Sequence, residues 1–186
     1  MKARVVVSLF ALLFIFGAAV HAQDVPKVDI FAGYSYVRAN PDTAGARSFN
    51  LNGGNASIAY NANSWLSGVA DFGGYTNGNI LNSNVSGTLS TYLFGPRVSY
   101  RRFEHVTPFA QALFGVAHVG TNFFGTSASD NAFAMAVGGG VDFPISHHLA
   151  VRPLQVDYLL TRFSETGNSA QSQHNLRAST GIVFRF

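Results

Sequence analysis

From Val28 to Phe186, apolar side chains recur at every second position, and clusters of Gly, Asn, Ser and Pro interrupt the runs. This is the period of a β-strand, because successive side chains of a strand point to opposite faces. Glycines and β-formers break every window in which a helix could be proposed. The pattern predicts an all-β fold with strands at Val28 to Val37, Asn52 to Asn61, Trp65 to Tyr75, Gly87 to Arg101, Thr107 to Gly120, Ala132 to Phe143, Leu149 to Arg162 and Asn175 to Phe186.

The connections between these eight strands alternate in length. Short turns are predicted at Asn61 to Ser64, Arg102 to Val106 and Pro144 to His148, and long polar connections at Arg38 to Leu51, Thr76 to Ser86, Thr121 to Asn131 and Phe163 to His174. This alternation gathers the long connections at one end of an antiparallel up-and-down meander. Transmembrane β-barrels have such an asymmetry, with short periplasmic turns and longer extracellular loops.

The two faces of the predicted strands differ in polarity. One face is nearly free of charge and carries Ile30, Ala32, Tyr34, Tyr36, Tyr92, Phe94, Val98, Tyr100, Ala110, Ala112, Phe114, Val116, Phe133, Met135, Val137, Val141 and Phe143. The other carries charged, polar and small residues. The interior of an eight-stranded barrel is just wide enough for side chains, so the bulky aromatic face does not fit inside it. We therefore expect an eight-stranded antiparallel transmembrane β-barrel whose apolar face meets lipid.

The first 22 residues predict export. Lys2 and Arg4 precede an almost continuous apolar run from Val5 to Val20, and cleavage is expected between Ala22 and Gln23. The alternative is an uncleaved anchor, but the apolar run is shorter than the roughly 20 residues of a spanning helix. We expect residues 1–22 to be a Sec-type signal peptide and residues 23–186 to be the barrel domain.

The composition excludes several classes of function. Charged residues make up 11% of the 186 residues, against about 25% in an average soluble domain. The chain has no cysteine, which excludes a disulfide framework and a thiol nucleophile. Two of the twelve basic residues lie in the leader, so ten remain against nine acidic ones. This near-neutral balance, without a basic stripe, predicts no nucleic-acid partner.

The last predicted strand ends on an aromatic residue. Ile182, Phe184 and Phe186 alternate with small and polar residues up to the end of the chain. A strand of this form resembles the signal that the barrel assembly machinery of the bacterial outer membrane reads. These three residues are the expected assembly signal, and that machinery is an expected partner.

Five further segments carry a resemblance to a known family. They are FAGYSY at residues 31–36, YLFGPR at 92–97, PFAQAL at 108–113, GGGVD at 138–142 and RPLQVDY at 152–158. In this order, and with the terminal aromatic strand, they resemble the OmpA-type small outer-membrane β-barrel family. The resemblance implies a Gram-negative outer membrane, contact with its lipids and periplasmic termini. It covers the barrel domain only and implies no peptidoglycan-binding domain.

The polar face carries six charged residues that are expected to meet in the lumen: Asp29, Asp71, Arg97, Asp142, Asp157 and Arg177. A narrow lumen offers little water, so each charge must be paired and hydrogen-bonded. We interpret them as a structural ion-pair network, with a proton relay or acid–base pair as the functional alternative. Along its strand, Arg152 has the parity of the lipid-facing residues (positions of the same parity point to the same face) and would face lipid unless Pro153 marks a β-bulge that turns it inward.

Candidate catalytic residues cluster near the end of the fifth predicted strand. His118 precedes Ser127, Ser129 and Asp130, which suggests a Ser-His-Asp set at the outer rim, but no strand is predicted to fix their geometry. Some barrels of similar size modify lipid A. Their deacylases carry His and Ser two apart on one strand face, and His118-Val119-Gly120 lacks that Ser. The sequence therefore predicts no catalytic residue.

Other motifs have structural explanations. His147 and His148 are adjacent in a tight turn and would point apart, so they do not form a metal site. Gly138 to Gly140 lies inside a strand, where close packing explains it better than phosphate binding. No cofactor is predicted. Tyr36, Tyr60, Trp65, Tyr75 and Tyr100 lie near strand ends, where aromatic girdles meet lipid headgroups.

These observations favour a non-enzymatic barrel with a structural or surface-interaction role through its extracellular loops, whose ligand the sequence does not name. A lipid A-modifying enzyme and a soluble secreted carrier barrel are the alternatives. An open porin is disfavoured, because eight strands leave a filled interior.

Overall fold

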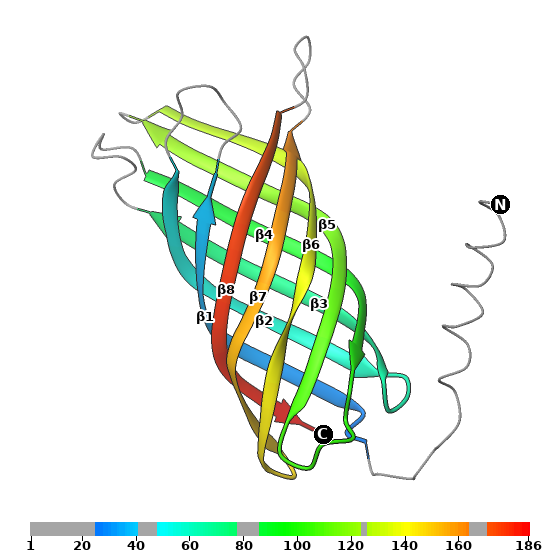
Figure 1. Ribbon diagram of the computed structural model, residues 1–186. Helices are drawn as coiled ribbons and strands as arrows, with labels where there is room; N and C mark the ends of the chain where they lie inside the picture. Colours follow the sequence, from blue (N-terminus) through cyan, green and yellow to red (C-terminus); the bar gives the residue numbers. More distant parts are fainter. Residues whose placement is uncertain (1–24, 41–47, 78–85, 124–125, 164–170) are drawn as a thin grey trace, which may run out of the picture.

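The computed structural model describes residues 25–40, 48–77, 86–123, 126–163 and 171–186. They form strands β1 (Val28–Ala39), β2 (Phe49–Asn61), β3 (Leu66–Asn77), β4 (Ser86–Ser99), β5 (Thr107–Phe123), β6 (Thr126–Ser146), β7 (Leu149–Phe163) and β8 (Gln171–Arg185). Each strand pairs antiparallel with the next, and β1 also pairs with β8, which closes the barrel (Figure 1). The predicted eight-stranded up-and-down architecture is confirmed.

One predicted connection is wrong. β5 and β6 continue as a two-stranded ribbon up to the pair Phe123 and Thr126, so most of the expected loop from Thr121 to Asn131 belongs to strands. Backbone pairing does not depend on apolar side chains, and a polar ribbon is stable where it meets water.

We call the end of the barrel that holds the β2–β3, β4–β5 and β6–β7 turns and the C-terminus the turn end, and the opposite end the loop end (Figure 1).

The last residue of the chain closes the barrel against the first strand. The Phe186 N–H donates to the Val28 carbonyl at 2.9 Å, and the Val28 N–H donates to the Phe186 carbonyl at 3.0 Å. The side chains of Ile182, Phe184 and Phe186 are exposed on the outside of this seam. The expected assembly signal therefore lies along the β1–β8 closure.

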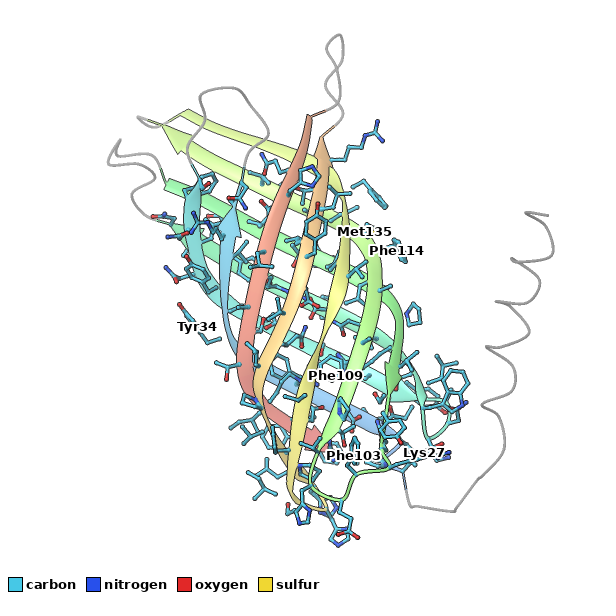
Figure 2. The ribbon with its side chains drawn as sticks, in the orientation of Figure 1. Lys27, Tyr34, Phe103, Phe109, Phe114 and Met135 are labelled. Atoms are coloured by element: carbon cyan, nitrogen blue, oxygen red, sulfur yellow. The ribbon has the colours of Figure 1, made fainter. Side chains whose placement is uncertain are left out.

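The exterior is apolar, as predicted. Large apolar side chains on the outside are 36–65% exposed and include Tyr34, which projects away from the barrel in Figure 2. Phe72 packs edge-to-face against Tyr92 and Phe94, with ring centroids 6.2 and 6.0 Å apart. The polar residues of the alternate positions are buried. This surface is the reverse of that of a water-soluble carrier barrel.

A β-bulge in β7 settles the side on which Arg152 lies. The register between β7 and β8 shifts between Arg152 and Gln155, so one extra residue is inserted beside Pro153. Arg152 and Gln155 are therefore both buried in the lumen. In a regular strand, residues three positions apart would point to opposite faces. The proline, which has no N–H to donate to the ladder, is tolerated at such a bulge.

No helix in the described part of the chain has the length and hydrophobicity to cross a membrane. The predicted signal peptide, residues 1–22, and its cleavage site between Ala22 and Gln23 lie outside the described residues. The export step stays a prediction.

Candidate functional site

Arg177 of β8 lies at the centre of the lumen and joins two other strands. Its guanidinium donates to Asp71 Oδ1 of β3 at 2.6 Å and to Asp157 Oδ2 of β7 at 2.8 Å. It also donates to the Tyr75 hydroxyl at 3.1 Å. All four side chains are at most 1% exposed. One cation between two carboxylates leaves a buried excess of negative charge, which needs further donors.

Side-chain amides supply those donors. Asn55 donates to Asp71 Oδ2 at 3.0 Å, Gln111 donates to Asp157 Oδ1 at 3.1 Å, and Gln155 donates to Asp157 Oδ2 at 2.7 Å. Every carboxylate oxygen of Asp71 and Asp157 therefore accepts at least one hydrogen bond. A fully satisfied polar network of this kind rigidifies the interior.

Arg97 is buried in the lumen, but it does not pair with a carboxylate as the sequence suggested. Its Nε and Nη2 donate to Gln111 Oε1 at 3.1 and 2.8 Å, and its guanidinium lies 4.5 Å from the centroid of the Phe109 ring. Within the described residues, no carboxylate comes within 4.0 Å of it. Parity decides which side chains enter the lumen, whereas the stagger of the strands decides which of them meet.

Arg152 pairs with the carboxylate of Asp142. The two groups form hydrogen bonds of 2.7 and 3.0 Å, and Arg152 also donates to Gln155 Oε1 at 2.7 Å. Its guanidinium lies 4.4 Å from the ring centroids of both Phe31 and Phe109, within the range of cation–π contacts. This cluster of arginine and aromatic rings fills the lumen between the central network and the turn end.

The charges at the turn end include two arginines that the sequence analysis missed. Arg101 Nη2 donates to Asp29 Oδ2 and to Asn61 Oδ1, both at 3.0 Å. Arg185 approaches Asp29 and Asp142 only to 4.0 and 3.9 Å. The strand alternation could have found both. Arg101 lies four positions after Arg97 and Arg185 eight positions after Arg177, so each points to the same inner face as the arginine before it.

The glycine run of β6 makes room for the network. A Cβ added at Gly138 would lie 2.6 Å from Asp157 Oδ1, and one at Gly140 would lie 2.9 Å from the Phe109 ring. The run therefore permits close packing inside a strand, as its position in the sequence suggested.

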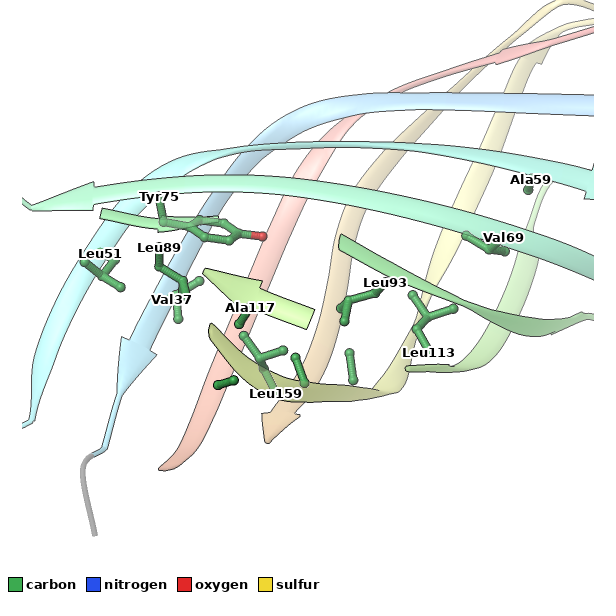
Figure 3. Packing of buried hydrophobic residues seen from close by; sticks show 13 residues of the cluster. Val37, Leu51, Ala59, Val69, Tyr75, Leu89, Leu93, Leu113, Ala117 and Leu159 are labelled. Carbon is green, nitrogen blue, oxygen red and sulfur yellow. The ribbon is translucent and has the colours of Figure 1, made fainter. Parts of the chain in front are cut away.

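Apolar side chains fill the lumen toward the loop end, which the sequence analysis did not predict. Val37, Leu51, Leu89 and Leu159 come from strands on different sides of the barrel and converge inside it (Figure 3). Tyr75 belongs to this cluster and is 1% exposed, so its expected place in a lipid-facing girdle is wrong. It lies at the same parity as Asp71, and this parity sends its ring inward.

The lumen is closed across these layers. Arg152, Arg177, Leu93, Leu113 and Leu159 have essentially no area accessible to water. An aqueous channel would leave such area on the side chains that line it. The middle of the barrel is therefore a packed interior, as expected for eight strands.

The candidate catalytic residues at the loop end are not brought together by what the structure describes. His118 is exposed, and its Nδ1 lies 2.9 Å from Asn131 Oδ1 of β6. The backbones of Ser127, Ser129 and Asp130 belong to β6, and their side chains lie outside the described residues. A second exposed histidine, His174, contacts the Tyr158 hydroxyl.

The histidines of the β6–β7 turn, His147 and His148, are exposed. Among the described residues, no three His, Cys, Asp or Glu side chains are grouped so that they could hold a metal ion.

Comparison with solved structures finds other small barrels. Neisserial surface protein A has a TM-score of 0.67 at 14% identity, and the alignment covers 86% of this chain and 97% of that chain. Ail, the attachment invasion locus protein of Yersinia pestis, has a TM-score of 0.56 at 19% identity, with 86% and 99% covered. OprG from Pseudomonas aeruginosa has a TM-score of 0.52 at 10% identity, with 87% and 96% covered. At these identities the likeness concerns the fold.

The sequence itself gives the family. No curated protein matches the chain, but the family model of the outer membrane protein β-barrel domain matches residues 8–186. This match covers nearly the whole chain and agrees with the closed barrel and its apolar exterior. The chain therefore belongs to the outer membrane protein β-barrel domain family and is located in the outer membrane.

Proposed function

We propose that this barrel is a non-enzymatic outer-membrane protein that acts through the loop end, as a structural or surface-interaction protein. The observation that carries the proposal is the closed lumen, because Arg177, Asp157 and Leu159 leave no accessible path through the middle of the barrel. With the lumen filled and the sides covered by lipid, the ends of the barrel remain for contact with other molecules. The loop end, which we expect to face outward, presents three connections of seven to nine residues and the β5–β6 ribbon.

The chemistry of the polar network supports a structural role for it. Asp71 and Asp157 are held by Arg177 and by amide donors, and none of these side chains is accessible to a substrate. A proton relay or an acid–base pair needs contact with a substrate or with water. The network therefore supports the barrel rather than a reaction.

The test is a barrel with shortened loops. Residues 41–47, 78–85 and 164–170 are each replaced by a two-residue turn such as Asn-Gly, and the β5–β6 ribbon is cut back to the pair Gly120 and Ser129. A deletion strain then produces either the wild type, this variant, or a control in which the exposed turn residues His147 and His148 are changed to Ala.

Two readouts decide the proposal. Heat-modifiable gel migration verifies folding, and adhesion of intact cells to surfaces coated with matrix proteins or glycans reports surface contact. We expect the wild type and the turn-end control to restore adhesion, and the short-loop barrel to fold without restoring it. Full restoration by the short-loop barrel would contradict the proposal. A lipid A mass that changes with the presence of the wild type would favour a lipid A-modifying enzyme instead.

A further inference from the structure

A cavity of about 840 Å³ opens at the turn end of the barrel, which we expect to face the periplasm. Its wall includes Lys27, Arg101, Arg185, Phe103, Ile145 and Phe186. Figure 2 shows Lys27 and Phe103 at this end, near the C-terminus of the chain. The cavity lies outside the central network, so it is accessible although the lumen above it is filled.

Arg185 brings a cation without a hydrogen-bonded partner to this cavity. The nearest carboxylate oxygens, on Asp29 and Asp142, are 4.0 and 3.9 Å away. Asp142 is engaged at shorter distance by Arg152 at 2.7 Å, and Asp29 by Arg101 at 3.0 Å through Oδ2, while Asp29 Oδ1 accepts no hydrogen bond from the described residues. Within the described residues, the Arg185 Nε is buried without a hydrogen bond. A guanidinium has five N–H donors in a fixed plane, and the part of the Arg185 side chain that stays exposed, 11%, belongs to the wall of the cavity.

Two more cations support Arg185. Arg101 uses its Nη2 for Asp29 and Asn61, while its Nε is buried without a hydrogen bond. Lys27 is exposed at the mouth of the cavity. Glu104 is the acidic residue among the described residues of the wall. Three cations and one carboxylate therefore line the wall, with Asp29 and Asp142 behind the two arginines. Arginine and lysine side chains grouped in this way are typical ligands of a phosphate group.

Part of the rim of the cavity is apolar. Phe103, Ile145 and Phe186 are 57%, 65% and 63% exposed, and Tyr100 packs against Phe103 with ring centroids 5.2 Å apart. Aromatic side chains at this level of a barrel lie in the membrane interface. A ligand that fits both parts has an anionic head for the arginines and an apolar portion for the rim.

We propose that this cavity binds the phosphodiester headgroup of an anionic phospholipid of the periplasmic leaflet, with Arg185, Arg101 and Lys27 as its ligands. Arg185 and Arg101 offer N–H donors to the phosphate oxygens, and Lys27 adds charge at the entrance. The acyl chains remain at the apolar rim and in the bilayer. This site is independent of the loops to which the proposed function is assigned.

The test uses the full barrel refolded in dodecyl maltoside micelles, which carry no charge. Calorimetric titration with dihexanoyl phosphatidylglycerol measures headgroup binding, and separate titrations use dihexanoyl phosphatidylcholine and sodium phosphate. The variants are Arg185→Gln and Lys27→Gln, and the matched control is Arg162→Gln, an exposed arginine near the loop end of β7.

We expect phosphatidylglycerol to bind more tightly than the other two probes. The Kd should rise at least about tenfold in Arg185→Gln, rise by a smaller factor in Lys27→Gln, and stay unchanged in Arg162→Gln, because hydrogen bonds to charged groups are the stronger ones. Lys27 is exposed and lies outside the ion-pair network, so its variant tests the site even where Arg185→Gln folds poorly.

Two results would contradict the proposal. Phosphatidylglycerol binding that is the same in Arg185→Gln, Lys27→Gln and Arg162→Gln would overturn the site. Sodium phosphate binding as tightly as the lipid, and lost in Arg185→Gln, would overturn the lipid as the occupant.

Discussion

Arg177 and Asp71 are 106 residues apart in the sequence, and their side chains meet inside the barrel at 2.6 Å. They belong to β8 and β3, which are not neighbours in the sheet, so the contact crosses the lumen. Hydrogen bonds of the sheet hold each strand to the next one only. This ion pair connects two separate parts of the barrel wall, and the stability of the barrel should depend on it.

The first prediction concerns this ion pair. Arg177→Met keeps much of the length of the side chain but leaves Asp71 and Asp157 buried without their cation. We expect it to lower the free energy of unfolding by about 3 to 5 kcal/mol, measured by urea unfolding in micelles. Arg162→Met, at an exposed position of β7, is the control and should have almost no effect. An unchanged unfolding midpoint for Arg177→Met would show that water reaches the two carboxylates.

Arg97→Met should be less harmful. Its guanidinium bonds to Gln111 rather than to a carboxylate, so the substitution leaves one buried amide oxygen unpaired. The expected loss is about 1 to 3 kcal/mol, in the same unfolding assay. A loss equal to that of Arg177→Met would mean that Arg97 serves the carboxylates at longer range.

The alternation of the sequence was sufficient to predict the fold. Ile30 and Tyr34 lie outside and Asp29 and Ser35 inside, because the side chains of a strand alternate and lipid selects the apolar face. The same rule placed Arg97 and Arg177 in the lumen. It could not give the partners of these arginines, because the partners depend on the stagger between strands that are distant in the sequence.

Two other features lay beyond the pattern. The bulge at Pro153 reverses the parity of β7, and a proline alone indicates where a bulge is tolerated but not that one is present. Leu93 and Leu159 lie inside although they are apolar, since a lumen without water can hold apolar side chains as well as paired charges. The polarity of a side chain therefore predicted the lipid-facing positions better than the luminal ones.

Deleting Phe186 should reduce assembly. The residue supplies both an exposed aromatic ring and two backbone hydrogen bonds to Val28 at the seam of the barrel. We expect less heat-modifiable, folded protein in outer-membrane fractions at equal synthesis. Phe103→Ala, which removes an exposed ring from the β4–β5 turn, should assemble normally. If the deletion variant folded in normal amounts, Phe186 would not be part of the assembly signal.

The closed lumen predicts no steady ion conductance. In planar lipid bilayers, the purified barrel should give no stable open-channel current. The reason is the zero accessibility of Arg177, Arg152 and Leu159 in the middle of the barrel. A sixteen-stranded porin, which has an aqueous channel, conducts under the same conditions and serves as the positive control. Long-lived ohmic steps of uniform size would contradict the packed interior.

The orientation of the barrel is the central claim, because it assigns the loops to the cell surface. The chain has no natural cysteine, so single cysteines can be placed at Ser48, Ser83, Ser127 and Ser169 near the loop end and at Asn63 and His147 in the turns. A thiol reagent that does not cross the outer membrane should label the four loop-end positions in intact cells and leave both turn positions unlabelled. All six should react after the membrane is permeabilised. Labelling of Asn63 and His147 in intact cells, with the loop-end positions silent, would contradict this orientation and the surface role built on it.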